Sequence, residues 1–318
     1  MRYRELDILR VFALGLILAC HYVRSHFESR LDMPLGAVGN LVFFILSGWL
    51  LGLQWQTKGC PHFGSRFLAK RIIRLMVPLW LFALPYMGWL IFDGYPLTVK
   101  NFCLELSLLN WFDKRPPGMT AFWFLTAIAA LYFLLVPLSR RFMSSWIVLG
   151  IGLALSVIAQ AVLYSVGVRQ GYLFIFMLLA VACFLYAHQL LSFVKFLATQ
   201  VWRFLPLLAS IAAFVILWWM FEKDVVTPGA PSSYWAASVV ALLIVVTVFA
   251  LFPEKENRIV SYISKRSYEI FLVHQCVLAI ANKQGGVVVY LVGSLVLAEL
   301  IHLVADKILV KVNNVLSH

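Results

Sequence analysis

Repeated apolar runs, each about 20 residues long, occupy most of this chain, and a run of that length crosses the hydrocarbon core of a bilayer as one helix. Hydrophobic residues make up 63% of the sequence and charged residues only 13%, about half the charged fraction typical of a soluble domain. The pattern predicts an all-α fold, a polytopic membrane bundle of about ten transmembrane helices. We expect one transmembrane domain over residues 1–318.

The expected spans are separated by short polar loops. They cover residues 7–25, 35–53, 75–92, 121–138, 146–166, 172–191, 204–221, 234–252, 268–281 and 286–309. The segment 99–111 is too short to span and is predicted to be interfacial or re-entrant. In the second span, Ser47 and Gly48 are small enough to let another helix approach closely.

The net charge of +12 lies largely in the loops, where it indicates topology and contact with anionic lipid rather than nucleic acid. Its distribution predicts both termini in the cytoplasm. Membrane lipids are therefore expected partners, no nucleic acid is expected, and the sequence does not indicate an oligomeric state.

The first span carries three ionisable side chains, Asp7, Arg10 and His21, within an otherwise apolar helix. Arg10 and His21 are eleven residues apart, so they share one helix face about 16 Å apart along the axis. Ionisable residues are expensive in hydrocarbon and usually face a bundle interior or a wet cavity. Asp7 is better explained as an interfacial residue, Arg10 fits either role, and the depth of His21 favours function.

A basic helical face precedes the third span. Arg66, Lys70 and Arg74 recur every four residues, and Arg71 widens the face that they form. The cluster suits either anionic lipid under the positive-inside rule or the phosphates of a cytosolic cofactor, which guanidinium groups bind through paired hydrogen bonds.

A second histidine, His274, lies inside the ninth span, as does Glu269. Together with His21 they indicate a polar interior path, and a histidine is suited to take a proton from a hydroxyl nucleophile. The sequence has no HExxH or CxxC motif and no carboxylate cluster beside these histidines, so no metal is expected. It has no Walker or GxSxG motif either. The five cysteines are interpreted as small buried hydrophobic residues.

An ordered set of motifs resembles the acyltransferase-3 family of bacterial integral-membrane acyltransferases. The set consists of Arg10 with His21, the run Phe43-Phe-Ile-Leu-Ser-Gly48, Arg71-x-x-Arg74 before Pro78 and Trp80, Phe122-Trp-Phe-Leu125, Tyr132-Phe-Leu-Leu-Val-Pro137, and Ser267-Tyr268 through His274. The middle of the chain resembles the family in hydropathy alone.

The resemblance implies a ten-helix bundle in the bacterial inner membrane that transfers an acyl group, usually acetyl from acetyl-CoA, to an envelope glycan. It also implies catalytic importance for His21, Arg10, Arg71 and Arg74. Ile128 and Ala129 stand where many members have an acidic pair, which resembles the subgroup acting on surface polysaccharides. Val11 replaces the glycine that usually follows the first arginine.

We therefore expect an O-acyltransferase with acyl-CoA as donor and an envelope glycan or lipid-linked sugar as acceptor. The cofactor phosphates are expected near Arg66, Lys70, Arg71 and Arg74. His21 is expected to be the base, with His274 or Arg10 stabilising the oxyanion. Two alternatives remain from the sequence: a carrier or flippase for a lipid-linked or anionic solute, disfavoured by the absence of evident inverted repeats, and a membrane scaffold without chemistry.

Overall fold

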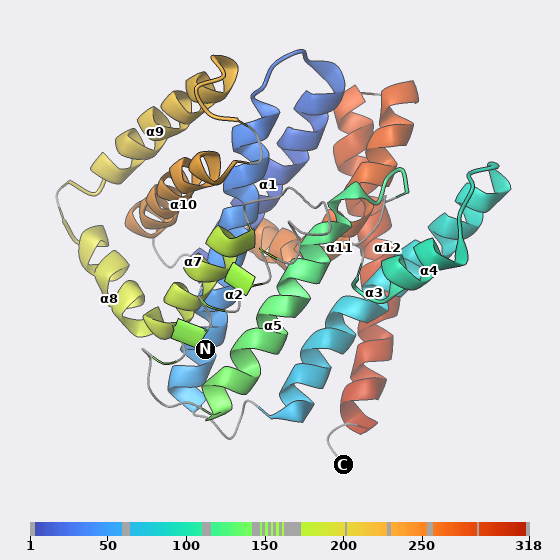
Figure 1. The fold of residues 1–318 in the computed structure, drawn as a ribbon, viewed down its shortest axis with the longest axis horizontal. Helices are drawn as coiled ribbons and strands as arrows, with labels where there is room; N and C mark the ends of the chain where they lie inside the picture. The colour runs from blue at the N-terminus through green and yellow to red at the C-terminus, as the bar shows by residue number, and fades with distance from the viewer. Residues whose placement is uncertain are drawn as a thin grey trace. The chain divides into compact units, whose positions relative to one another are not determined.

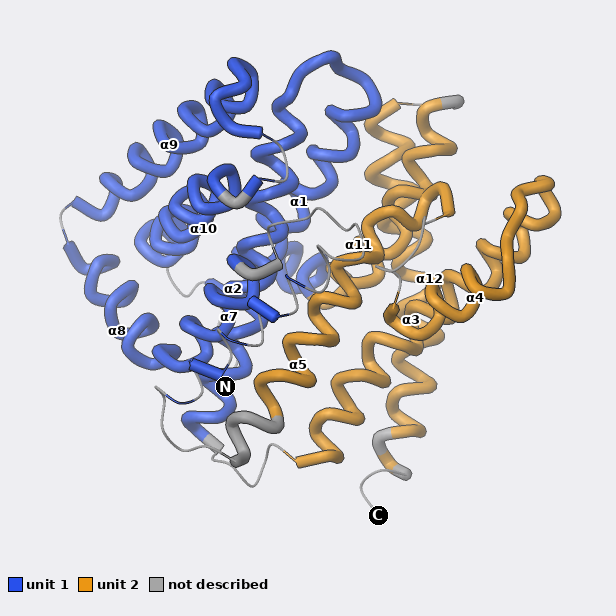
Figure 2. The backbone as a smooth tube through the Cα atoms, in the orientation of Figure 1, with its two compact units in different colours: residues 1–62, 137–264 blue, residues 63–136, 265–318 orange. Residues whose placement is uncertain are grey.

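The computed structural model describes residues 4–58, 64–109, 116–141, 173–200, 202–227, 230–252, 257–284 and 286–315, with scattered positions between 147 and 161. Every regular element within these ranges is helical, which confirms the all-α class (Figure 1). The chain divides into two compact units (Figure 2). Unit 1 comprises residues 1–62 and 137–264, and unit 2 comprises residues 63–136 and 265–318.

Unit 1 is organised around one buried helix, α2. The unit contains α1 (Arg4–His26), α2 (Asp32–Lys58), α7 (Leu173–Leu185), α8 (Ala187–Ala198), α9 (Leu205–Glu222) and α10 (Pro231–Leu251). Helix α2 packs against each of the other five. Leu41, Phe44 and Trp49 on α2 are fully buried, so this helix forms the core of the unit.

Two glycines allow α2 and α7 to approach closely. A Cβ atom added at Gly48 would lie 2.0 Å from the carbonyl oxygen of Ala180, and one added at Gly52 would lie 2.2 Å from that of Phe184. Both obstacles are backbone atoms, which cannot rotate away. The prediction that Gly48 permits close helix approach is therefore confirmed.

Gly48→Ala is expected to destabilise the protein by about 1–3 kcal/mol, the usual cost of overpacking a close-packed interior. The measurement is thermal unfolding of the detergent-solubilised protein. Gly15→Ala is the matched control, because no atom lies within 4 Å of the position its Cβ would occupy. An unchanged unfolding temperature for Gly48→Ala would contradict the contact between α2 and α7.

The expected span over residues 172–191 is not one straight helix. The helix is interrupted at Tyr186, between the end of α7 and the start of α8, and the axes of the two helices differ in direction by 83°. Side chains of α2 satisfy the backbone at the break. Gln56 donates to the oxygen of Leu185 at 2.8 Å and accepts from the amide of His188 at 3.0 Å, while the Trp49 indole donates to the oxygen of Ala187 at 2.9 Å. These tertiary hydrogen bonds make a bend possible that hydropathy does not reveal.

Unit 2 contains α3 (Ser65–Phe92), the short helix α4 (Val99–Leu106), a 3₁₀ turn η2 (Thr120–Phe122), α5 (Trp123–Arg141) through Val136, α11 (Arg258–Gln284) from Lys265, and α12 (Gly286–Val315). Helix α3 packs against α12 and α4. The Tyr268 hydroxyl on α11 donates to the oxygen of Leu75 on α3 at 2.7 Å, and Gln275 accepts from Thr120 and from the amide of Ala121. Hydrogen bonds thus connect helix α11 to both α3 and the 3₁₀ turn η2 that precedes α5.

Six helices within the described residues are long and apolar enough to cross a membrane, or seven if the bent pair α7–α8 is one span. The predicted polytopic membrane bundle is confirmed in this form. The expected fourth span is a shorter apolar helix, and the expected ninth lies in the more polar α11. Most of the expected fifth span, 146–166, falls outside the described residues. The count of ten spans and the cytoplasmic termini stay predictions.

Candidate functional site: a cationic cavity in unit 2

A cavity of about 380 Å³ opens where α3, α11 and α12 meet within unit 2. One face of each helix contributes to its lining. The lining residues are Phe67, Lys70, Arg71, Arg74 and Pro78 from α3, Lys265, Tyr268 and Glu269 from α11, and His302, Ala305, Asp306 and Leu309 from α12. The unit therefore concentrates ionisable side chains at one place along otherwise apolar helices.

Four cations line this cavity, and three of them come from the basic face that the sequence predicted. Lys70, Arg71 and Arg74 lie on consecutive turns of α3, and Lys265 joins them from α11. Arg66, on the same helix, is exposed and is not among the lining residues. The predicted phosphate-binding cluster is thus brought together except at its first member.

The guanidinium of Arg71 lies over two aromatic rings of unit 2. Its Cζ atom is 5.2 Å from the centroid of the Phe67 ring and 5.9 Å from that of Tyr132 on α5. Such contacts favour a planar guanidinium over a lysine ammonium and hold the group in one orientation. Arg71 is therefore preorganised at the cavity wall, whereas Lys70 and Arg74 are exposed.

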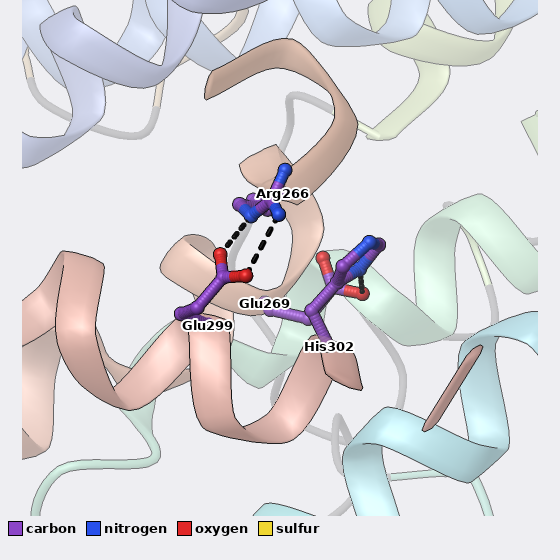
Figure 3. Close-up of polar contacts among 4 residues, drawn as sticks. All are labelled: Arg266, Glu269, Glu299 and His302. Atoms are coloured by element: carbon purple, nitrogen blue, oxygen red, sulfur yellow. Dashed lines mark hydrogen bonds and ion pairs between the residues drawn. The ribbon is translucent and has the colours of Figure 1, made fainter. Parts of the chain in front are cut away.

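Two polar pairs connect α11 to α12 beside the cavity (Figure 3). Arg266 makes a two-fold ion pair with Glu299, through Nε to one carboxylate oxygen and through Nη2 to the other at 2.8 Å. One turn away, His302 Nδ1 lies 3.0 Å from Glu269 Oε1. Because a carboxylate accepts, Nδ1 carries the proton, and the neutral ring keeps its lone pair on Nε2.

The sequence prediction missed His302, Glu299 and Asp306. A signal for them exists, since they occur at spacings of three and four on the otherwise apolar α12 and hence share one face. Arg266 and Glu269 show the matching spacing of three on α11. Ionisable residues at matching spacing on two neighbouring helices predict a polar seam between them.

His274 lies deep in unit 2 but does not line the cavity. The residue is fully buried, and its Nδ1 donates to the carbonyl oxygen of Phe271 at 2.6 Å. The ring of Phe271 also contacts Phe124 of α5, at a centroid separation of 5.2 Å. In the neutral ring Nε2 is therefore an acceptor, so His274 cannot donate from Nε2 to an oxyanion until it is protonated.

Arg10 belongs to unit 1, where Asp7 and Ser264 hold it. Its Nη1 donates to Asp7 Oδ1 at 3.3 Å and to Ser264 Oγ at 3.1 Å, and Ser264 Oγ donates to Asp7 Oδ1 at 2.6 Å. Asp7 is buried, with 8% of its surface exposed, so it is part of this cluster rather than only an interfacial residue. Asp7 and Ser264 together orient the guanidinium of Arg10, which lies in the first third of α1.

His21 lies in the last third of α1, also in unit 1, and is partly buried. Beside it, Arg24 makes an ion pair with Asp32 at 2.7 Å, which links the end of α1 to the start of α2. Tyr22 stacks on His26 at a centroid separation of 4.1 Å. His21 thus lies near the end of α1, close in sequence to the ion pair that links α1 to α2.

The fold and cavity together define a polytopic helical membrane protein with a cationic site on one unit. A family model described as an acyltransferase domain matches residues 3–301, nearly the whole chain. The chain belongs to the acyltransferase-3 family, as its motifs predicted, and is a membrane acyltransferase. Searches of curated proteins and of solved structures found no match. Within the described residues, no group of three His, Cys, Asp or Glu side chains is placed to hold a metal ion.

Proposed function

We propose that the protein moves an acetyl group from cytosolic acetyl-CoA to a hydroxyl of a bacterial envelope glycan or lipid-linked sugar. The observation that carries the donor assignment is the cavity of unit 2, where Lys70, Arg71, Arg74 and Lys265 converge in a chain of this acyltransferase family. CoA carries three phosphate groups, and clustered cations are the side chains that recognise them.

The charges of the cavity support an anionic ligand. Four cations face two carboxylates, those of Glu269 and Asp306, so a net charge of two positive units remains when His302 is neutral. Arg71, fixed by its aromatic neighbours, offers a planar fork for two phosphate oxygens, and the exposed Lys70 and Arg74 add point contacts. A structural ion-pair network would instead balance its charges.

The catalytic assignment remains that of the sequence, with His21 as the base. The acceptor hydroxyl gives its proton to His21 and attacks the thioester carbonyl, after which the C–S bond breaks and CoA leaves as the thiolate. Arg10 is the better candidate to stabilise the oxyanion. Its guanidinium is always charged and is oriented by Asp7 and Ser264, whereas His274 donates its Nδ1 proton to Phe271.

The carrier alternative would gain support from a broken helix, because discontinuous helices often form transport sites. The break between α7 and α8 does not favour it. Gln56 and Trp49 already satisfy the backbone groups of Leu185, Ala187 and His188 there, so these groups are not available to a solute.

Release of CoA by the purified protein tests the proposed function. In nanodiscs, acetyl-CoA should be consumed in step with acetylation of an added polysaccharide acceptor, followed by mass spectrometry of the glycan. His21→Ala protein provides the blank. Movement of a labelled lipid-linked sugar across the bilayer without CoA release would instead establish the carrier.

A further inference from the structure

The pairing of Glu269 with His302 has a chemical consequence for any anion that enters the cavity. Glu269 is buried, and its Oε1 accepts a hydrogen bond from Nδ1–H of His302, with 3.0 Å between the nitrogen and the oxygen. Figure 3 shows this pair beside the ion pair of Arg266 with Glu299. With Nδ1–H committed to the carboxylate, Nε2 presents a lone pair in the neutral ring and repels a phosphate oxygen. It donates a hydrogen bond only after the ring gains a second proton.

An anionic ligand would change the charge that surrounds His302. The groups that face the cavity with it are Lys70, Arg71 and Arg74 of α3, Lys265, Tyr268 and Glu269 of α11, and Asp306 of α12. The four cations outnumber the two carboxylates, so the empty cavity has an excess of positive charge when His302 is neutral. A phosphomonoester brings nearly two negative charges at neutral pH and removes that excess.

We propose that Glu269 and His302 form a proton-linked phosphate-recognition pair. A phosphomonoester dianion enters the cavity, His302 takes up one proton from water, and Nε2–H donates to a phosphate oxygen while Nδ1–H stays on Glu269. His302 is thus a specificity-determining residue that favours a phosphomonoester, with two charges, over a phosphodiester, with one. The identity of the ligand rests on the proposed function, in which the phosphomonoester is the 3′-phosphate of CoA.

Two sources present this chemistry, a nucleotide phosphomonoester and the headgroup of phosphatidic acid. The test is titration calorimetry on the full chain in nanodiscs at pH 7.5, in two buffers with different ionisation enthalpies. At this pH the phosphomonoester is almost wholly dianionic, since its second pKa is about 6, so net proton uptake reports the protein. CoA should bind with proton uptake, and dephospho-CoA, which lacks only the phosphomonoester, should bind with less.

His302→Gln is expected to abolish the proton uptake and weaken CoA binding roughly tenfold to hundredfold, the value of one charged hydrogen bond. Glu269→Gln should reduce the uptake, because the amide does not compensate an imidazolium charge. Neither change should affect the binding of dephospho-CoA comparably. His188→Gln, on an exposed histidine of unit 1, is the matched control and should behave as the wild type.

The outcomes separate this inference from the donor assignment. CoA binding without proton uptake, equal in wild-type and His302→Gln proteins, overturns the proton-linked pair and leaves acyl-CoA as donor. Proton uptake with phosphatidic acid but not with CoA supports the pair and overturns the donor assignment. Absence of any response to either ligand overturns both.

Discussion

His21→Ala is expected to slow acyl transfer by about 10²–10⁴-fold, the contribution typical of a positioned general base. The imidazole accepts the proton of the acceptor hydroxyl, and alanine removes that group while leaving α1 intact. His21→Gln should fail as badly, because an amide keeps polarity and approximate size but accepts no proton at neutral pH. Single-turnover acetyl transfer from acetyl-CoA, measured beside CoA affinity, gives both quantities.

The CoA affinity of both His21 variants should stay near that of the wild type, since the proposed phosphate-binding cavity belongs to unit 2 and His21 to unit 1. His26→Gln, five residues later on the same helix and exposed, is the matched control. Near-normal turnover in His21→Gln would show that the histidine is structural and would move the role of base to His274.

Replacing Arg71 and Arg74 together with alanine is expected to weaken acyl-CoA binding by a few kcal/mol, because each charged hydrogen bond to phosphate contributes about 1.5–3 kcal/mol. The single variant Arg71→Lys should retain only part of the affinity for acyl-CoA. It keeps the charge but loses the planar fork and the stacking over Phe67 and Tyr132. Equilibrium binding of CoA to the protein in nanodiscs measures the loss.

Arg258→Ala removes one positive charge from an exposed position that does not line the cavity, and it is the control for general electrostatics beside each single arginine variant. Arg66→Ala should have a smaller effect than Arg74→Ala, since Arg74 lines the cavity and Arg66 does not. If CoA affinity is unchanged in the Arg71 and Arg74 double variant, the cluster binds lipid phosphates and only anchors α3.

The basic face of α3 can be recognised from local sequence because helical periodicity depends only on spacing. Lys70, Arg71 and Arg74 line the cavity, as residues on one helix face would. Arg66 does not, because the lining residues of α3 begin at Phe67 and continue through Pro78. The partners on α12 escaped prediction for a different reason. His302 gains a role only when α12 packs beside α11 and places its Nδ1 against Glu269.

The bend between α7 and α8 likewise depends on tertiary contacts that the local sequence does not reveal. Residues 172–191 are apolar enough for a straight span, and no proline marks Tyr186. The break depends on Trp49 and Gln56, which lie more than a hundred residues earlier and supply hydrogen bonds that the two helices lack at the break. Hydropathy measures the free energy of transfer into lipid and carries no information about such partners.

The sequence by itself determined the membrane class, the helical fold and the family, because bilayer thickness, helix periodicity and ordered motifs are all local properties of the chain. It also located Arg10, His21 and the basic face of α3. Only the tertiary structure decided that Ser264 bonds both Arg10 and Asp7, that the Arg71 guanidinium lies over the ring of Tyr132, and that Glu269 pairs with His302. These contacts join segments far apart in the chain, and their geometry arises from helix packing rather than from residue spacing.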